Sequence, residues 1–551
     1  MKLNNSKWIV GGLLIVGVIV LVGLAFPFMS RSSINEILRT EHCAMMPGMG
    51  GCEQYRGQYQ ETSSTFDRSI IGLVSAQETA NYPASSGQTM QLSADIVKKD
   101  MSGRKIRMFG YNGQIPGPLI KVRQGDTLYV NFTNNLDQET TVHWHGLRLE
   151  NANDGVPGMT QEPVQSGESF LYKLDFPDAG LYWYHPHVRE DYQQELGLYG
   201  NIIVTPSDTS LLSPVNEEAF LFLDDIQLGT DGDIMPIYKE KISQVLMGRF
   251  GTTLLVNGKT SYDLTVKQGE VVRFYITNAA NTRVFNLSIA GAQLKLVGSD
   301  GGFYEQERWA DSVIIAPSER AVVEAYFNRV GTYDLQNINP AQTYTLGTIT
   351  VLPEQTETSY ASSFVTLRDK DSVKAEVDSL RQYLTQAPDA SLRLTIQFPG
   401  MQGRGNHGMM GMMHGADEGG IEWEDTMQPM NFASSNRTVN WEIIDQRTGK
   451  ANEAIDFAWN VGDKVKIRLF NDPNSMHPMQ HPIHLHGQRF VVLSMDGVPN
   501  DNLVWKDTVL VPMGSTIDIL MDVTNPGEWM AHCHIAEHLS DGMMFSFNAE
   551  L

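Results

Sequence analysis

The histidines of this chain gather in four short clusters, a pattern that can hold metal ions. Ten of the fourteen histidines lie in "HWHG", "HPH", "HPIHLHG" and "HCHIAEH", and none lies between Val188 and Asn406. The clustered residues are His143, His145, His185, His187, His481, His484, His486, His532, His534 and His538. A lone histidine is most often an ordinary core or surface residue, but four clusters at ligand spacing indicate metal binding. The ligands would come from the two ends of the chain and not from its middle.

A single cysteine, Cys533, lies between two histidines of the last cluster. On a β-strand, side chains at i and i+2 share one face while i+1 points to the other, so one strand can contact two metal sites. Two imidazoles, a thiolate and a thioether form the ligand set of a blue-copper electron-transfer centre. Here that set would be His481, Cys533, His538 and Met543. The eight remaining histidines suffice for three copper ions able to bind O₂. A hydrolytic zinc site is the competing interpretation, but zinc needs neither ten histidines nor a Cys–Met pair.

The elements that must position these residues follow a threefold repeat. The stretches "VRQGDTLYVNFTN" (122–134), "VKQGEVVRFYITN" (266–278) and "WNVGDKVKIRLFN" (459–471) share a glycine followed by an acid, with an asparagine nine residues after the glycine. Between these residues, apolar and polar side chains alternate, which predicts half-buried β-strands. We therefore expect an all-β protein of three related domains, each an antiparallel sandwich or barrel.

Composition changes along the chain suggest the boundaries of these domains. The third domain would carry a methionine-rich insert at 401–430, and the middle domain, without histidine, would be a structural spacer without copper ligands. The predicted parts are an anchor at 1–30, a stalk with Met and Cys at 31–87, domains at 88–207, 215–355 and 390–551, and a linker with a short helix at 356–389.

The N-terminus contains a stretch that is long enough to cross a membrane. Trp8 to Met29 form a 22-residue run without a charged side chain, and such a helix would be about 33 Å long. No clear cleavage site follows, so we expect an uncleaved transmembrane helix and not a removed signal. Lys2 and Lys7 place the N-terminus in the cytoplasm and the catalytic part outside it, at the cell surface or in the periplasm.

The charge of the chain limits the partners that it can bind. A formal net charge of -23 argues against nucleic acid and leaves cations as the better partners. Two further cysteines, Cys43 and Cys52 in "HCAMMPGMGGC", would face an oxidising compartment. They could form a disulfide loop or serve as thiolate ligands, and the sequence leaves both open.

Taken together, these motifs resemble the three-domain multicopper oxidases of bacterial or archaeal type, a family that includes laccases and cuprous oxidases. All four copper motifs are in family order, and "DGVPGMTQEPVQSGESF", "GLYWYHPH" and "GLYGNIIV" match as well, so the resemblance covers about residues 88–551. It implies three cupredoxin-like Greek-key β-barrel domains and four copper ions. It also implies an oxidoreductase that takes single electrons at a type 1 copper and reduces O₂ to two waters at a trinuclear cluster.

The resemblance also implies a role for each clustered residue. The type 1 ligands would be His481, Cys533, His538 and Met543, and the type 2 ligands would be His143 and His484. The type 3 ligands would be His145, His185 and His534 for one copper and His187, His486 and His532 for the other.

Water formation consumes protons, so a carboxylate is expected near the cluster. Asp154, nine residues after His145, matches the acidic residue of the family. Several bacterial members carry a glutamate where this sequence has Leu539, so a second proton donor is not identified. In "VWKDTV", we expect Trp505 to be packed and Asp507 to cap a strand, with a position near the type 1 site as the alternative for both.

The four histidines outside the clusters all stand within three residues of a methionine, and thioether sulfur prefers Cu(I). We therefore predict a cuprous oxidase for copper tolerance. A laccase-like oxidase of phenols, or an oxidase of Mn(II) or Fe(II), is the alternative, and a copper-storage protein is the third. The insert could also be inert low-complexity sequence. Candidate Cu(I) sites are His407, Met409, Met410, Met412, Met413, His414, Met476, His477 and Met479.

Overall fold

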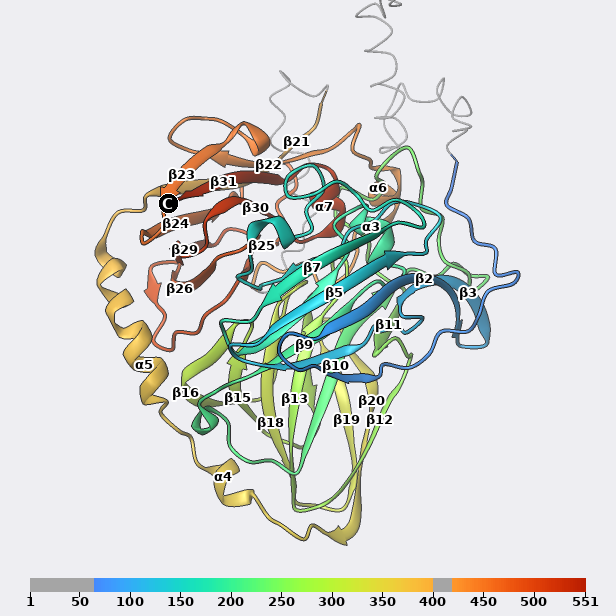
Figure 1. Ribbon diagram of the computed structural model, residues 1–551, viewed down its shortest axis with the longest axis vertical. Coiled ribbons are helices and arrows are strands. Elements are labelled where there is room, and N and C mark those ends of the chain that lie inside the picture. The colour runs from blue at the N-terminus through green and yellow to red at the C-terminus, as the bar shows by residue number, and fades with distance from the viewer. Residues whose placement is uncertain (1–63, 400–418) are drawn as a thin grey trace, which may run out of the picture.

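The computed structural model describes residues 64–399 and 419–551. The predicted anchor, residues 31–63 of the stalk with Cys43 and Cys52, and the candidate sites from His407 to His414 lie outside the described residues. Among the helices of the described part, none is long and apolar enough to span a bilayer. Most of the regular elements of the described chain are β-strands, as expected from the alternating repeats (Figure 1).

The first two sheets have the strand orders β1-β4-β9-β8-β6 and β3-β2-β5-β7, and they enclose one apolar core. Their strands are β1 (Asn81–Pro83), β2 (Thr89–Met101), β3 (Arg104–Tyr111), β4 (Leu119–Arg123), β5 (Thr127–Asn134), β6 (His143–His145), β7 (Ser169–Asp175), β8 (Gly180–His185) and β9 (Gly200–Thr205). A 3₁₀ turn, η2 (Asn151–Asn153), and a short helix, α3 (Glu190–Gln193), lie in the connections.

The next two sheets have the orders β11-β10-β13-β18-β15-β16 and β12-β20-β19-β14-β17 and share a second core. Their strands are β10 (Glu217–Ile226), β11 (Thr253–Val256), β12 (Tyr262–Gln268), β13 (Glu270–Asn278), β14 (Phe285–Ile289), β15 (Leu294–Ser299), β16 (Gly302–Ala310), β17 (Val313–Ile315), β18 (Arg320–Phe327), β19 (Gly331–Ile338) and β20 (Thr343–Gln355). The turn η3 (Thr209–Leu211) precedes them.

The last two sheets have the orders β22-β21-β24-β29-β26-β27 and β23-β31-β30-β25-β28. Their strands are β21 (Ala390–Gln397), β22 (Asn440–Asp445), β23 (Asp456–Asn460), β24 (Lys464–Asn471), β25 (His481–Leu485), β26 (Arg489–Met495), β27 (Val498–Pro499), β28 (Thr508–Val511), β29 (Thr516–Asp522), β30 (Gly527–Cys533) and β31 (Met544–Glu550). The helices and turns before and within them are α4 (Ala361–Val365), α5 (Asp371–Val377), η4 (Asp378–Thr385), α6 (Gln428–Ala433), η5 (Asn452–Ala454) and α7 (Ala536–Ser540). In Figure 1, α4 and α5 run along the outside of the molecule.

The repeated asparagine has the same structural role in each pair of sheets. Asn134, Asn278 and Asn471 end the equivalent strands β5, β13 and β24 and are buried. Each side-chain amide donates two hydrogen bonds, at 2.7 to 3.0 Å, to backbone carbonyls of neighbouring loops and strands. The asparagine therefore satisfies buried carbonyls that the ladders leave unpaired, which explains why the repeat contains it.

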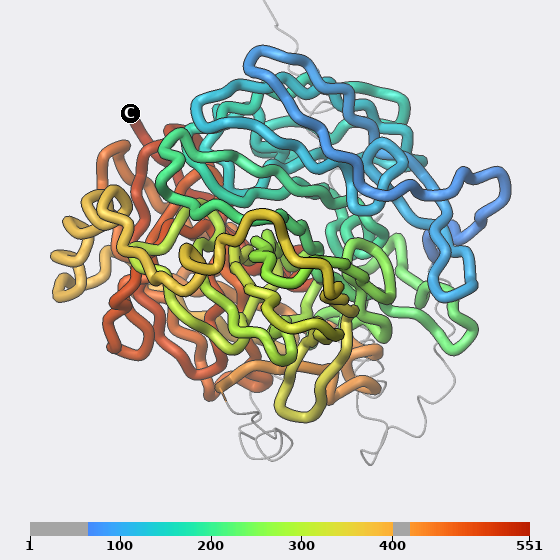
Figure 2. The backbone as a smooth tube through the Cα atoms, turned by 90° about the horizontal axis from the view of Figure 1, so that it is seen from below, coloured from blue at the N-terminus to red at the C-terminus, as the bar shows by residue number. Residues whose placement is uncertain are grey.

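The middle part of the chain packs against both ends (Figure 2). The connection between β10 and β11 leaves the middle sheets, and residues 242–250 of it enter the core of the last two sheets. We call residues 242–250 the cover segment. Its apolar side chains in that core are Ile242, Val245, Leu246, Met247 and Phe250. Because this segment belongs to the middle of the sequence, three distant parts of the chain meet around the clustered histidines.

Candidate metal centres

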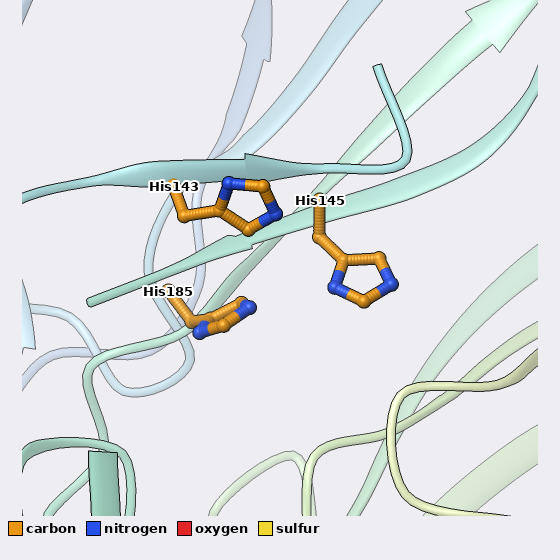
Figure 3. A group of neighbouring side chains, drawn as sticks. All are labelled: His143, His145 and His185. Atoms are coloured by element: carbon orange, nitrogen blue, oxygen red, sulfur yellow. The ribbon is translucent and has the colours of Figure 1, made fainter. Parts of the chain in front are cut away.

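Eight of the clustered histidines form a buried group that we call the histidine cage: His143, His145, His185, His187, His484, His486, His532 and His534. Strand β6 pairs with β8 and places His143 opposite His185, and β25 pairs with β30 and places His484 opposite His532. The other four lie on or directly after these strands. All eight side chains are buried. Figure 3 shows the first three as neighbours from two adjacent strands.

The two ends of the chain interleave their rings inside the cage. The centroid of His145 lies 3.7 Å from that of His484, and His143 lies 4.0 Å from His486. Three groups have all their ligand atoms within 4.8 Å of one another, namely His143–His145–His185, His143–His484–His486 and His187–His486–His532. The last group is one predicted type 3 set. The members of the other set, His145, His185 and His534, have ring centroids 5.1 to 5.6 Å apart.

Hydrogen bonds at the periphery fix the ring orientation of most cage histidines. Nδ1 of His143, His185, His484 and His532 each bonds a backbone carbonyl at 2.8 to 2.9 Å. Nδ1 of His187 lies 3.0 Å from Glu190 Oε1, a contact that the sequence analysis missed. The Nε2 atoms of His143, His185, His187 and His484 are buried without a hydrogen-bond partner. Buried nitrogens rarely lack a partner, so these atoms fit a site that a metal ion completes.

The protonation states also fit a copper site. Burial lowers the pKa of His145, His185, His484, His532 and His534 well below the ordinary value, and burial together with His143 lowers that of His486 to about 3. His187 differs, because the carboxylate of Glu190 outweighs the effect of burial and raises its pKa. Metal ions bind neutral imidazole, so most of the cage is held in its ligating form.

We expect the metal-free protein to lose stability as the pH falls below about 6.5. The folded state keeps imidazoles such as those of His185 and His484 neutral, whereas the unfolded chain binds protons from that pH downward. Each such histidine lowers the free energy of unfolding by about 1.4 kcal/mol per pH unit in this range. Thermal unfolding of the apoprotein near pH 7.5 and pH 5.5 measures the effect. A melting temperature that is equal or higher at the lower pH would contradict this prediction.

Asp154, the predicted catalytic residue, contacts a histidine from each end of the chain. Its Oδ2 accepts a hydrogen bond from His486 Nδ1 at 2.8 Å, and its carbonyl accepts one from His143 Nδ1 at 2.8 Å. Burial raises the pKa of Asp154, but His486 and His143 outweigh burial and hold that pKa well below the ordinary value. The next residue, Gly155, has φ +81°, and a Cβ there would lie 2.0 Å from Val142 O. The glycine therefore allows the turn that places the carboxylate.

A second carboxylate, Asp507, reaches the cage at a position that the sequence did not indicate. It directly precedes β28, and its Oδ1 lies 3.0 Å from His145 Nε2 while its carbonyl bonds His484 Nδ1 at 2.8 Å. We expected a strand cap or a position near the type 1 site. Trp505 is packed, with the Arg489 guanidinium 3.9 Å from its ring centroid. An acid directly before a strand is common in β-proteins, and the pairing of β28 with β25 appears only in the structure, so the sequence carries no specific signal for this contact.

The second candidate centre lies around Cys533, which ends β30. Its Sγ is 3.5 Å from His481 Nδ1 and 3.8 Å from His538 Nδ1, and these ligand atoms form one compact group. Met543 is buried in the same core, and its backbone carbonyl accepts the Cys533 N–H at 3.1 Å. Burial raises the pKa of the thiol well above its ordinary value. A metal ion that displaces the thiol proton would make this group a ligand, as in copper–thiolate sites.

Trp441 and the cover segment enclose this second centre. The Trp441 ring centroid lies 4.4 Å from that of His538 and 4.8 Å from that of His481. Its indole N–H donates to Val245 O of the cover segment at 2.8 Å. All three side chains are fully buried. Solvent and large molecules therefore have no direct access to the edges of the two imidazoles.

The three candidate Cu(I) residues that the structure describes lie just before β25. Met476 is half-buried, while His477 and Met479 are buried, and both methionines contact the core that contains Cys533. In the described part of the insert, the Glu422 N–H donates to Gln480 Oε1 at 2.8 Å, and Gln480 Nε2 donates back to Glu422 O. The insert is thus bonded to a residue that directly precedes His481.

Comparisons with known proteins agree with this arrangement. Three family models described as multicopper oxidase match residues 95–209, 236–358 and 424–550, about two thirds of the chain. A multicopper oxidase of Staphylococcus haemolyticus is 26% identical over 443 residues, which cover 79% of this chain and 82% of that protein. Laccase-1 of Botryotinia fuckeliana is 28% identical over 497 residues, which cover 84% of this chain and 80% of that protein.

Solved structures match over most of the chain. A multicopper oxidase from Pseudomonas thermotolerans aligns with a TM-score of 0.63 at 26% identity, covering 84% of this chain and 100% of that one. The fold of a multicopper oxidase from Campylobacter jejuni, described as a metallo-oxidase, aligns with a TM-score of 0.64 at 23% identity, covering 88% and 99%. The three pairs of sheets are therefore cupredoxin-like, and the chain belongs to the multicopper oxidase family, copper-dependent oxidoreductases that use O₂ as electron acceptor.

Proposed function

We propose that this protein oxidises Cu(I) to Cu(II), so that four Cu(I) ions and four protons convert one O₂ into two waters. We also propose four resident copper ions, one of type 1, one of type 2 and two of type 3. Their ligands would be the sets given by the family resemblance, which include all eight cage histidines and the group around Cys533. When bound, the copper ions would supply the one-electron redox chemistry for O₂ reduction, while the protein orients the ligands and moves protons.

The enclosure of the Cys533 centre is the observation that best supports a metal ion as substrate. An aromatic substrate transfers an electron most readily when its ring contacts a ligand imidazole, but His481 and His538 are fully buried under Trp441 and the cover segment. A small ion bound outside this cover can instead donate its electron through the intervening protein atoms. The enclosure therefore favours Cu(I), or another reducing metal ion, over a phenol.

The side chains around the same core supply soft ligands that select Cu(I). Thioether sulfur binds Cu(I) better than hard divalent ions. Met427, Met430 and Met476 are partly buried against the core that contains Cys533 and Met479. The insert at 401–430 contains Met427 and Met430, and its residue Glu422 is bonded to Gln480. In sequence it also carries Met401, Met409, Met410, Met412 and Met413. This choice of donors favours Cu(I) over Mn(II) and Fe(II).

Deletion of residues 405–416 is expected to lower Cu(I) turnover by at least about tenfold, because it removes four thioethers and two imidazoles. Phenol turnover should be unchanged or higher. Steady-state O₂ uptake with each reductant measures both rates. A variant with Met409, Met410, Met412 and Met413 replaced by serine keeps the chain length and should behave like the deletion if sulfur is responsible.

The other outcomes separate the alternative functions. Unchanged Cu(I) turnover in both variants would overturn the role of the insert, and a phenol rate far above the Cu(I) rate in the unaltered protein would indicate a laccase-like oxidase. If copper-loaded protein takes up no O₂ with any donor, the copper-storage alternative holds.

The proposed location rests on the sequence of the N-terminus. The uncharged run from Trp8 to Met29 would anchor the protein in a membrane, with the catalytic part outside the cytoplasm. Cu(I) oxidation there would act before the ion enters the cytoplasm. Extraction of membranes with alkaline carbonate separates an integral anchor, which stays in the membrane fraction, from a cleaved signal.

A further inference from the structure

One buried arginine of the middle sheets reaches the histidine cage. Arg320 is the first residue of β18, and its side chain is fully buried. Its Nη1 donates to Asp507 Oδ1 at 2.6 Å and its Nη2 to Asp507 Oδ2 at 2.5 Å. Such a bidentate pair fixes the plane of the carboxylate as well as its position. The middle of the chain, which supplies no histidine, is thus connected to the cage through one ion pair.

The carboxylate that Arg320 holds decides the orientation of His145. Asp507 Oδ1 lies 3.0 Å from His145 Nε2, and Thr508 Oγ1 lies 3.1 Å from the same nitrogen. A carboxylate accepts hydrogen bonds, so Nε2 carries the proton and Nδ1 has the free lone pair. Nδ1 of His145 is buried without a hydrogen-bond partner.

This orientation is the reverse of that found for the other histidines with fixed rings. His143 and His484, for example, have Nδ1 held at the periphery and Nε2 without a hydrogen-bond partner. His145 thus presents Nδ1 only because an acceptor lies beside its Nε2. If the carboxylate moved, only the Thr508 hydroxyl among the described residues would still hold this tautomer.

The remaining contacts of Arg320 leave the ion pair little freedom to move. Its Nε donates to Leu181 O on β8, the strand that ends in His185, and its Nη1 also donates to Ser318 O. The backbone beside His145 packs directly on the pair: a Cβ at Gly146 would lie 2.3 Å from Asp507 Oδ2 and 3.0 Å from Arg320 Nη2. The pair therefore joins all three pairs of sheets at the cage.

We propose that Arg320 is a positioning residue of the histidine cage, which holds Asp507 so that His145 binds metal through Nδ1. The middle domain then takes part in the metal site and is more than a spacer. The proposal rests on copper binding in the cage and not on which substrate is oxidised. A negative result for Arg320 would therefore leave the proposal of Cu(I) as substrate intact, and a different substrate would leave the role of Arg320 intact.

Replacement of Arg320 tests this proposal through copper affinity. In Arg320→Met we expect copper of the cage to bind about 10- to 100-fold more weakly, as is usual when a residue that orients a ligand is lost. Competition with a chelator and elemental analysis give the affinity and the copper content. The electron paramagnetic resonance of the cage should change, while the blue absorption of the Cys533 centre should not. Arg320→Lys, which cannot bind both oxygens, should give an intermediate effect.

A second buried arginine of the middle sheets provides the matched control. Arg273 on β13 is buried and paired with Glu324 at 2.7 Å, and it also contacts Ser213 and Glu218, which lie outside the cage. Arg273→Met is expected to lower the melting temperature without changing the affinity for cage copper. If Arg320→Met binds copper like the unaltered protein, or if both variants weaken binding equally, the proposal is wrong.

A second variant keeps the test decisive if Arg320→Met does not fold. Asp507→Asn has the same shape but lacks the charge that pairs with Arg320, so we expect the same loss of cage copper and the same spectroscopic change. If Asp507→Asn keeps the affinity and the resonance signal of the unaltered protein, the proposal is overturned. Where both single variants fold, the double variant should lose no more copper affinity than either single variant, because the two residues act as one unit.

Discussion

Cys533→Ser is expected to abolish the blue absorption and to lower substrate oxidation by at least about 10³-fold, while the cage keeps its copper. The loss should exceed the 10- to 100-fold typical of residues that only orient a ligand, because a hydroxyl replaces the thiolate itself. Cys533 Sγ lies 3.5 Å and 3.8 Å from the two imidazoles of its group. The adjacent residues His532 and His534 belong to the cage, so this residue also forms the shortest covalent connection between the two centres.

Absorption spectroscopy, copper analysis and O₂ uptake check this result. Cys43→Ser and Cys52→Ser are the matched controls, because they make the same chemical change at cysteines that are not in the predicted ligand set, and they should leave the blue absorption intact. A blue Cys533→Ser protein would show that the ligand is elsewhere. Complete loss of copper from the cage would show that the serine disrupts the fold around β30 and not only the Cys533 centre.

Asp154→Asn is expected to lower turnover by about 10²- to 10⁴-fold, the range usual for a group that transfers protons. The amide cannot carry the negative charge that Asp154 places between His486 and His143. Copper content and blue absorption should stay unchanged. Stopped-flow measurements separate the two half-reactions: reduction of the enzyme by substrate should keep its rate, and reoxidation by O₂ should become slow.

Asp445→Asn is a control for this second prediction, since Asp445 is buried and bonds only residues of its own turn and strand region. It should leave both half-reactions unchanged. If Asp154→Asn slows the reduction step instead, or if reoxidation keeps its rate, Asp154 does not deliver protons to the cage.

The sequence identified no second proton donor, because Leu539 stands where several bacterial members of the family carry a glutamate. Leu539 is buried in an apolar cluster with Val156 and Met530. Glu537 lies nearby in α7 and accepts a hydrogen bond from Asn281 of the middle part at 3.1 Å. Besides Asp154 and Asp507, Glu190 is a third acidic side chain in contact with a cage histidine, three residues after His187. Glu190 is the first residue of α3 and His187 precedes this short helix, so the "HPHVRE" stretch has no helical period that would have revealed the contact.

The sequence by itself determined the metal chemistry and the all-β fold. Ligand spacing on strands is local: residues at i and i+2 share a face wherever the strand lies, so "HWHG" and "HCHIAEH" indicated their function without a tertiary structure. The asparagine of the repeat was equally visible, although its role in bonding two carbonyls appeared only in the fold. The anchor and the methionine-rich insert, which lie outside the described residues, stay predictions.

Only the tertiary structure decided which groups surround those ligands. Asp507 is 362 positions from His145 and 187 from Arg320, and Trp441 meets Val245 across 196 positions. Acids before strands and buried tryptophans are both common in β-proteins, so neither the residue type nor the adjacent sequence predicts such contacts. The orientation of His145 and the enclosure of the Cys533 centre depend on how three pairs of sheets pack, because each contact joins side chains whose spacing in the sequence follows no local period.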